Sequence, residues 1–169
     1  MIVFRDFDPR LPRSGFDCGK AAMNDWFRTQ AGQQERGDSV RTHLGLATVD
    51  SSIASFYSLA AHRIELDTAA STSLFSKRRY PIPSLLIARL AVDVRYQGNG
   101  IGALTLGDAL SRCATVSKEI GVEVILVDAI DESAAAFYKK HGFEELTNDG
   151  RTLFVSSKAL RASLPKIAK

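Results

Sequence analysis

The stretch RYQGNGIG, residues 95–102, has glycines at positions 98, 100 and 102 and joins two segments of different character. Residues 85–94, which precede it, are apolar enough for a strand buried on both faces. From residue 101 onward, apolar side chains recur at the spacing of one helix face as far as Gly121. The pattern predicts a buried strand, a glycine-rich turn and a long helix.

A turn of this kind suits an anionic ligand. Glycines let several backbone N–H groups point into one concavity, and the helix N-terminus adds partial positive charge, so the stretch predicts a pyrophosphate site. It lacks the Gly-Lys-Ser/Thr ending of a P-loop and departs from the G-x-G-x-x-G register of a dinucleotide fold. A plain tight turn with glycine caps is the alternative interpretation.

The rest of the chain alternates between helical and extended patterns. Residues 20–36 place apolar side chains at helical spacing before Gly37 and Asp38, which predicts one amphipathic helix there. Residues 65–84 combine Ser, Thr, basic residues and two prolines, which is typical of a loop. The other expected elements are a strand at 2–7, a hairpin of 41–50 and 53–64, a strand at 122–127, a helix at 132–140, and short strands at 143–146 and 152–155.

Length and composition are those of an ordinary globular domain. The chain has 169 residues, of which 45% are hydrophobic and 24% charged, enough for a core without disulfides or metals. We expect one domain over residues 1–169, of mixed α/β class, with a single central sheet flanked by helices. The net charge of +3 permits an anionic partner such as a nucleotide or RNA without requiring one.

The sequence predicts a cytoplasmic protein with no membrane span and no bound metal. The first ten residues, MIVFRDFDPR, carry charges where a signal peptide needs an apolar run. The most apolar stretch stops at Arg89, far short of a membrane span. Cys18 and Cys113 form neither a C-x-x-C pair nor part of a metal-ligand cluster, so both are expected to be reduced.

The turn resembles the cofactor loop of the GNAT acetyltransferases. Arg95-x-x-Gly98-x-Gly100 is similar to that family's Q/R-x-x-G-x-G/A signature, and Ala135-Ala136-Phe137-Tyr138 before Gly142-Phe143 is similar to its second cofactor-contacting helix. The resemblance implies the GNAT fold and acetyl-CoA as cofactor. It also implies a set of cofactor-binding residues: Leu90, Ala91 and Val92 at the pantetheine arm, Arg95, Gln97, Gly98, Asn99, Gly100, Ile101 and Gly102 at the pyrophosphate, and Phe137.

Tyr138 is the expected catalytic acid. A phenol can donate a proton to the sulfur that leaves as an amine attacks the thioester, and the resemblance places such a tyrosine here. Aromatic packing beside Phe137 is the alternative role. No histidine stands out as a base: His141 lies near a helix end, and His43 and His62 lie in or near strands. The α-amine of an amino acid whose carboxyl is esterified is less basic than lysine, and even ordinary α-amines have a pKa of about 7.7–8.0. Such an amine has a much larger neutral fraction near neutral pH than lysine and needs no dedicated base, which favours it as the acceptor.

Within the GNAT family the chain resembles the acetyltransferase toxins of bacterial toxin–antitoxin modules. The similar segments are Phe16-Asp17-Cys18-Gly19, Phe56-Tyr57-Ser58-Leu59, Arg89-Leu90-Ala91-Val92-Asp93, the turn 95–102, Val127-Asp128-Ala129 and Phe137-Tyr138. The resemblance implies acetylation of the α-amine of aminoacyl-tRNA, which blocks translation. It further implies a homodimer and a small antitoxin of ribbon-helix-helix type as partners.

Basic residues then gain an expected role in binding tRNA. On that resemblance Lys77, Arg78, Arg79 and Arg89 would contact acceptor-stem phosphates, which fix position without reading sequence. Solvated surface is the alternative for the first three, and a structural ion pair for Arg89. Two other functions remain open: a GNAT enzyme acting on a small amine or a protein amine, and a non-catalytic module that binds acetyl-CoA. Consumption of acetyl-CoA in the presence of charged tRNA distinguishes the aminoacyl-tRNA function from these two.

Overall fold

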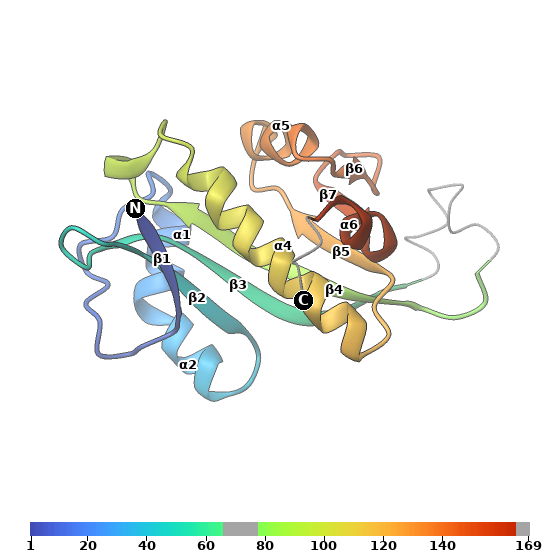
Figure 1. Cartoon of the computed structure of the whole chain (residues 1–169), viewed down its shortest axis with the longest axis horizontal. Coiled ribbons are helices and arrows are strands. Elements are labelled where there is room, and N and C mark those ends of the chain that lie inside the picture. Colours follow the sequence, from blue (N-terminus) through green and yellow to red (C-terminus); the bar gives the residue numbers. More distant parts are fainter. Residues whose placement is uncertain (66–77, 165–169) are drawn as a thin grey trace. The chain divides into compact units, whose positions relative to one another are not determined.

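The computed structural model describes residues 1–65 and 78–164. Its strands form one seven-stranded sheet in the order β1-β2-β3-β4-β5-β7-β6 (Figure 1). The strands are β1 (Ile2–Asp6), β2 (Arg41–Ala47), β3 (Ile53–Ile64), β4 (Ile82–Val92), β5 (Val124–Asp128), β6 (Glu144–Glu145) and β7 (Thr152–Ser156). The helices are α1 (Ala21–Thr29), α2 (Ala31–Arg36), the 3-10 turn η2 (Val94–Tyr96), α4 (Ile101–Glu119), α5 (Glu132–Lys140) and α6 (Ser157–Ser163).

The sheet is mixed, as the sequence predicted. β4 runs parallel to β5 over Ser84–Ile87, whereas β1 with β2, β2 with β3, β5 with β7 and β6 with β7 are antiparallel. A parallel pair requires a crossover connection, and α4 lies between these two strands in the chain. Among the helices of the described residues, none is both long and apolar enough to cross a membrane.

The chain divides into two compact units, each of which takes two segments of the sequence. The first unit comprises Met1–Ala60 and Ala88–Ala109. Its core is aromatic: the rings of Phe27 and Phe56 are stacked with centroids 4.0 Å apart, and Phe16 meets both edge-on. Trp26 stacks on Phe56 at 6.0 Å, so α1 is attached to β3 through three aromatic side chains.

The second unit comprises Ala61–Ile87 and Leu110–Lys169, of which the structure describes the residues given above. One cluster of buried side chains in it is aliphatic except for a single aromatic ring. The central members are Ile82 of β4, Val124 and Leu126 of β5, and Phe154 of β7. Helices α5 and α6, both close to β7 in sequence, contact this strand.

The predicted helix over residues 20–36 is wrong as a single element. The chain forms α1 and α2 with a break at Gln30, whose φ and ψ are −110° and −30°. The hydroxyl of Thr29 donates to the carbonyl of Asp25 at 2.6 Å, an interaction within the last turn that favours bending of a helix. Phe27 and Ala31 lie on either side of the break, and both are fully buried in the core.

Other boundaries moved because burial overrode local composition. β4 begins at Ile82, so residues 82–84 form strand rather than loop, and Ile82 and Ser84 are buried. Residues 66–77 of the predicted loop lie outside the described residues. Helix α6 was not predicted; its N-cap is Ser156, whose hydroxyl accepts from the N–H of Ala159 at 3.0 Å. The predicted first strand, the hairpin and the helix at 132–140 are confirmed.

Candidate active site

The glycine-rich turn lies in the first unit and has the backbone geometry of an anion site. Gly98 and Gly100 have φ of +78° and +77°, values that side chains other than glycine seldom adopt. Apart from the glycine's own chain neighbours, no described residue comes within 4 Å of a Cβ placed at either position, so these residues leave the space beside them open. Helix α4 begins at Ile101, and the N–H groups of its first turn have no partner within the helix. These residues fit the pyrophosphate of a nucleotide cofactor.

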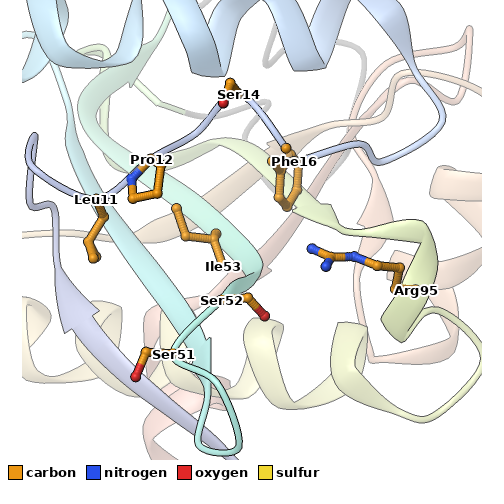
Figure 2. A pocket seen from close by; sticks show the side chains of 9 residues that line it. Leu11, Pro12, Ser14, Phe16, Ser51, Ser52, Ile53 and Arg95 are labelled. Carbon is orange, nitrogen blue, oxygen red and sulfur yellow. The ribbon is translucent and has the colours of Figure 1, made fainter.

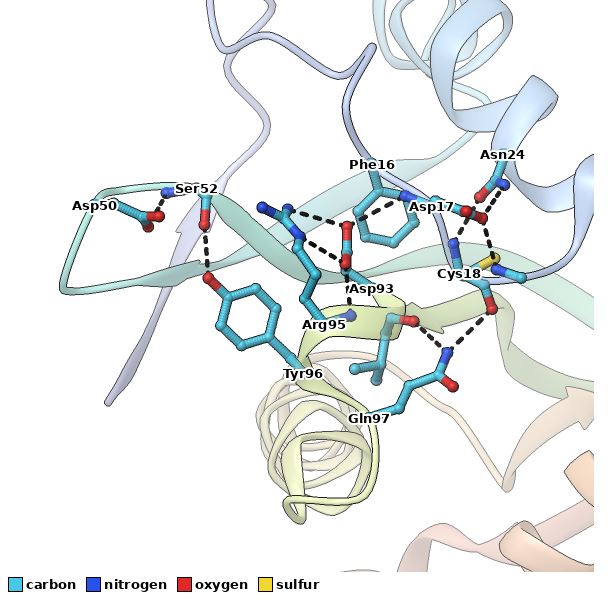
Figure 3. A network of polar contacts seen from close by, with 12 residues as sticks. Phe16, Asp17, Cys18, Asn24, Asp50, Ser52, Asp93, Arg95, Tyr96 and Gln97 are labelled. Carbon is cyan, nitrogen blue, oxygen red and sulfur yellow. Dashed lines mark hydrogen bonds and ion pairs between the residues drawn. The ribbon is translucent and has the colours of Figure 1, made fainter.

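A buried carboxylate fixes the entrance to this turn. The side chain of Asp93 is 1% exposed and accepts hydrogen bonds from three donors of Arg95: the backbone N–H and Nε, each at 2.9 Å, and Nη2 at 3.1 Å (Figure 3). A fourth hydrogen bond comes from the N–H of Asp17 at 3.2 Å. Burial raises the pKa of Asp93, but these hydrogen bonds outweigh it and hold the pKa below its ordinary value. The charge of Asp93 therefore orders both η2 and the loop around Asp17.

Gln97 makes a second connection between the same segments. Its amide nitrogen donates to the carbonyl of Cys18 at 3.0 Å and to that of Val92 at 2.8 Å (Figure 3). The carboxylate of Asp17 accepts from the N–H of Gly19 and from the side chain of Asn24, both at 2.8 Å, which fixes that loop before α1. The side chain of Gln97 thus positions the turn, leaving its backbone for the ligand.

Sequence reasoning gave Asp17 and Asp93 no physical role, although both lie in segments that carried the family resemblance. A signal was present in the sequence. Asp93 and Arg95 are two positions apart, the spacing at which an aspartate can accept from the following backbone and side chain, and Asp8 with Arg10 repeats it. What the sequence did not contain was the partner 76 positions away, the N–H of Asp17.

Arg95 also borders a cavity of about 330 Å³ in the first unit. Figure 2 shows its guanidinium on the same side as Phe16, Ser52 and Ile53, with Leu11 and Ser14 completing the wall. The Arg95 guanidinium lies 5.5 Å from the centroid of the Tyr96 ring, and the Tyr96 hydroxyl is 2.8 Å from that of Ser52. Three donors of Arg95 are already used by Asp93, so the predicted contact of Arg95 with the cofactor stays a prediction.

The last residues of β4 offer backbone groups beside the turn. The register of β4 with β5 ends at the pair Ile87 and Val127, while β4 itself continues to Val92. Over Leu90, Ala91 and Val92, β4 is thus not in register with β5, and a ligand that mimics a strand can pair there. The side chain of Ala91 is buried, whereas those of Leu90 and Val92 are partly exposed.

Tyr138, the predicted acid, lies in the second unit on α5. It is 6% exposed and packs edge-on against Phe137 at 5.3 Å and Phe143 at 5.6 Å, so the aromatic-packing role is real. Burial raises its pKa well above the ordinary value, and the negative charge of Asp128 raises it further. The phenol therefore keeps its proton at every physiological pH, which suits a donor and excludes a base.

The histidines have structural positions. His141 ends α5, where its Nδ1 donates to the carbonyl of Phe137 at 2.8 Å and its ring lies 4.6 Å from that of Phe137. His43 is buried and stacks on Tyr57 at 5.0 Å, whereas His62 is exposed on β3. Within the described residues no group of three or more His, Cys, Asp or Glu side chains could hold a metal ion.

Three of the four predicted tRNA contacts lie within the described residues. Lys77 lies outside the described residues, and Arg79 is exposed. Arg78 forms an ion pair with Glu123 in the second unit. Arg89 belongs to the first unit, where its guanidinium lies 4.1 Å from the centroid of the Trp26 ring, and partial burial lowers its pKa. A cation over an indole is a stabilising contact, so Arg89 has a packing role whatever else it binds.

Comparison with known protein families decides what this geometry belongs to. The model of the acetyltransferase (GNAT) domain matches residues 60–145, just over half of the chain. The chain is a GNAT acetyltransferase. The match includes β4, the turn, α4, β5 and α5, that is, every element to which the sequence assigned a cofactor contact.

Relatives of this GNAT acetyltransferase extend over most of its length. A protein of Mycobacterium tuberculosis (strain ATCC 25618 / H37Rv) named "tRNA-acetylating toxin" is 31% identical over 150 residues, which cover 88% of each chain. The solved structure of AtaT complexed with acetyl-methionyl-tRNAfMet has a TM-score of 0.85 at 27% identity and covers 96% of this chain and 98% of that one. That of AtaTR bound with AcCoA has a TM-score of 0.82 at 25% identity and covers 95% and 96%.

Proposed function

We propose that this GNAT enzyme transfers the acetyl group of acetyl-CoA to the α-amine of aminoacyl-tRNA and acts as a toxin by blocking translation. The observation that carries the proposal is the 31% identity, over 88% of both chains, with a tRNA-acetylating toxin. The structural similarity to AtaT in its complex with acetyl-methionyl-tRNAfMet supports the same acceptor class. If the enzyme acetylates no aminoacyl-tRNA, the alternative is a GNAT enzyme that acts on small amines.

The cofactor half of the site is built by backbone groups. The N–H groups of residues 97–102 bind the pyrophosphate, since the left-handed Gly98 and Gly100 and the start of α4 leave them open. The backbone of residues 90–92, beyond the register with β5, pairs with the pantetheine arm. Arg95 and Asp93 keep the turn in this conformation, and Phe137 adds an apolar contact. Acetyl-CoA supplies the acetyl group as an activated thioester.

Tyr138 is the catalytic acid. The amine nitrogen forms the new bond to the acetyl carbon as the carbon–sulfur bond breaks, and the Tyr138 hydroxyl donates its proton to the departing sulfur. As the amide forms, the nitrogen releases one proton to solvent, from which the Tyr138 phenolate regains its own. The raised pKa of Tyr138 ensures that the proton is present before the reaction. An α-amine, at a pKa of about 7.7–8.0, is largely neutral near pH 8 and needs no histidine to remove a proton.

The acceptor half binds RNA through cations. Arg78 and Arg79 are exposed in the second unit, and together with Lys77 they supply positive charge for acceptor-stem phosphates. Arg89, held over Trp26, is a further contact to the acceptor end. The acceptor amino acid is defined by the experiment below.

The partners and location follow the same proposal. The enzyme works in the cytoplasm as a homodimer, and a small antitoxin of ribbon-helix-helix type neutralises it. Solved structures of similar fold include AtaT bound to the C-terminus of the antitoxin AtaR, which supports a protein inhibitor. Sedimentation equilibrium of the purified chain tests the dimer, since a monomer at micromolar concentration would contradict it.

The first experiment supplies radiolabelled acetyl-CoA and total aminoacyl-tRNA to the purified enzyme and identifies the acetylated aminoacyl ends. We expect label on a restricted set of charged tRNAs and none on the same tRNAs after deacylation, because the acceptor is the amino acid. The matched control is Tyr138→Phe, which keeps the ring and its packing. Label on no RNA, together with normal acetyl-CoA binding, would reject the tRNA acceptor and leave a GNAT enzyme for another amine.

A further inference from the structure

Two basic segments that are far apart in the sequence meet at one pocket of the second unit. Arg78 precedes β4, whereas Lys158 and Arg161 lie on α6, 80 and 83 positions later. All three line a cavity of about 400 Å³ whose lining also includes apolar side chains of β5 and β7, among them Phe154. The tertiary fold thus gathers cations that the sequence presents as two separate surface clusters.

The pocket has a net positive charge. Glu123 is the one acidic side chain in its lining, and it is already paired with Arg78. Lys158 and Arg161 are three positions apart on a helix, so they lie on the same face, and both are exposed. Like charges gathered in this way repel one another, and the apolar side chains in the lining strengthen their electrostatic field. An anion in the pocket removes that repulsion.

Two of these cations are also held in place. Nη1 of Arg161 donates to the hydroxyl of Ser117 on α4 at 2.9 Å, which restrains the guanidinium. Among the described residues its other nitrogen atoms have no hydrogen-bond partner. Arg78 is restrained in the same way by Glu123. Restrained guanidinium groups lose less conformational entropy when they bind a phosphate than free side chains do. The geometry is therefore that of a prepared phosphate site rather than of solvated surface charges.

We propose that Arg78, Lys158 and Arg161 form one phosphate-binding pocket that takes the RNA backbone of the tRNA substrate. This inference rests on the proposed function, since it names a second place where the same substrate is bound. The pocket does not distinguish one RNA base sequence from another, because phosphate contacts fix only the position of the RNA. It contributes to affinity for the whole tRNA and has no part in the acetyl transfer itself.

The test compares the parent enzyme with Lys158→Gln/Arg161→Gln and with a matched control, Arg5→Gln/Arg10→Gln. Each double variant removes two exposed charges, and the control pair belongs to the first unit and does not line the pocket. The KM for charged tRNA is measured over a salt series. A second acceptor, adenosine esterified with the same amino acid, has the reactive amine but no stem phosphates. Thermal unfolding checks that both variants are folded.

We expect the pocket variant to raise the KM for charged tRNA and to make its logarithmic salt dependence shallower by about 1–2, roughly one for each lost phosphate contact. Its turnover of the adenosine ester should equal that of the parent, and the control should change neither measurement. An unchanged KM and salt dependence for tRNA would overturn the pocket, as would an equal loss with both acceptors. If the parent acetylates no charged tRNA, the proposed function is rejected, whatever the variants do. The pocket is then tested by the binding of an uncharged acceptor-stem duplex, which the variant should bind more weakly than the parent; equal binding would reject the pocket.

Discussion

Replacing Asp93 with asparagine tests whether its charge holds the cofactor turn. The substitution keeps the shape of the side chain and the acceptor oxygen that faces the N–H and Nε of Arg95. It puts an NH2 group in place of the second oxygen, which faces Nη2 of Arg95 and the N–H of Asp17. Two attractive contacts of a buried side chain thus become contacts between donors.

The magnitude follows from the burial of the two partners. Breaking a fully buried ion pair costs about 3–5 kcal/mol, but water screens part of this pair because the Arg95 side chain is 54% exposed. We expect the free energy of unfolding to fall by about 2–3 kcal/mol. For a chain of this length the corresponding fall in Tm is about 5–10 °C. The KM for acetyl-CoA should rise several-fold while the kcat changes little, because the turn is displaced and the acid is not.

The pH dependence identifies the charge as the cause. Asp93 has a folded pKa below its unfolded value of about 3.9, so its stabilisation is fully present above that value and is lost as the pH falls through the folded pKa. The difference in unfolding free energy between parent and variant should be constant from about pH 5 to 8 and shrink below about pH 4. A difference that is the same at pH 7 and pH 3 would refute this reasoning.

Asp8→Asn is the matched control, because the chain repeats the motif at its N-terminal end. Asp8 accepts from the N–H, Nε and Nη2 of Arg10 at 2.9, 3.0 and 2.9 Å, nearly the distances found for Asp93. Its side chain is 30% exposed, and that of Arg10 is 88% exposed. The control should lower Tm far less than Asp93→Asn and leave the KM for acetyl-CoA unchanged. If Asp8→Asn and Asp93→Asn lowered Tm equally, burial of the carboxylate would not be what makes the Asp93–Arg95 contact stabilising.

Three further substitutions test the other assignments. Tyr138→Phe should lower acetyl transfer by roughly 10²–10⁴ with little change in acetyl-CoA affinity, as measured by steady-state turnover and calorimetric titration; unchanged turnover would remove Tyr138 as the acid. Gly100→Val should weaken acetyl-CoA binding, because its methyl groups fill the open space beside the turn. It should also lower the free energy of unfolding by about 1–2 kcal/mol, because a β-branched residue is strained at φ +77°. Normal affinity for acetyl-CoA would show that the pyrophosphate does not bind here. Gly107→Ala, inside α4 with open space around it and no positive φ, should instead stabilise the enzyme by about 0.5–1 kcal/mol in denaturant titrations without altering acetyl-CoA affinity.

Local patterns in the sequence were sufficient for the elements that carry the cofactor turn. The helix predicted from residue 101 to Gly121 spans Ile101–Glu119, and the helix predicted at 132–140 is α5. Both patterns repeat over several turns, so the side chains of each helix define its apolar face without reference to the rest of the chain. The roles given to Tyr138 and to the residues of the turn stay predictions.

Elements whose limits depend on neighbouring strands were predicted less well. β4 starts at Ile82 because its pairing with β5 begins at Ser84 and Val124, although Pro81 and Pro83 favour a loop. The break at Gln30 separates two helices that both contribute to the aromatic core, Phe27 from one and Ala31 from the next. Neither the pairing nor the shape of the core is a property of the segment itself.

By itself, the sequence determined the glycine turn between strand and helix, the family resemblance and the expectation of acetyl-CoA. Only the tertiary structure decided which distant groups meet: the carboxylate of Asp93 with the N–H of Asp17, and Arg78 with Arg161 around one pocket. The physical reason is that backbone preferences and apolar periodicity act over a few residues, whereas buried hydrogen bonds and clusters of charge require segments many residues apart to come together.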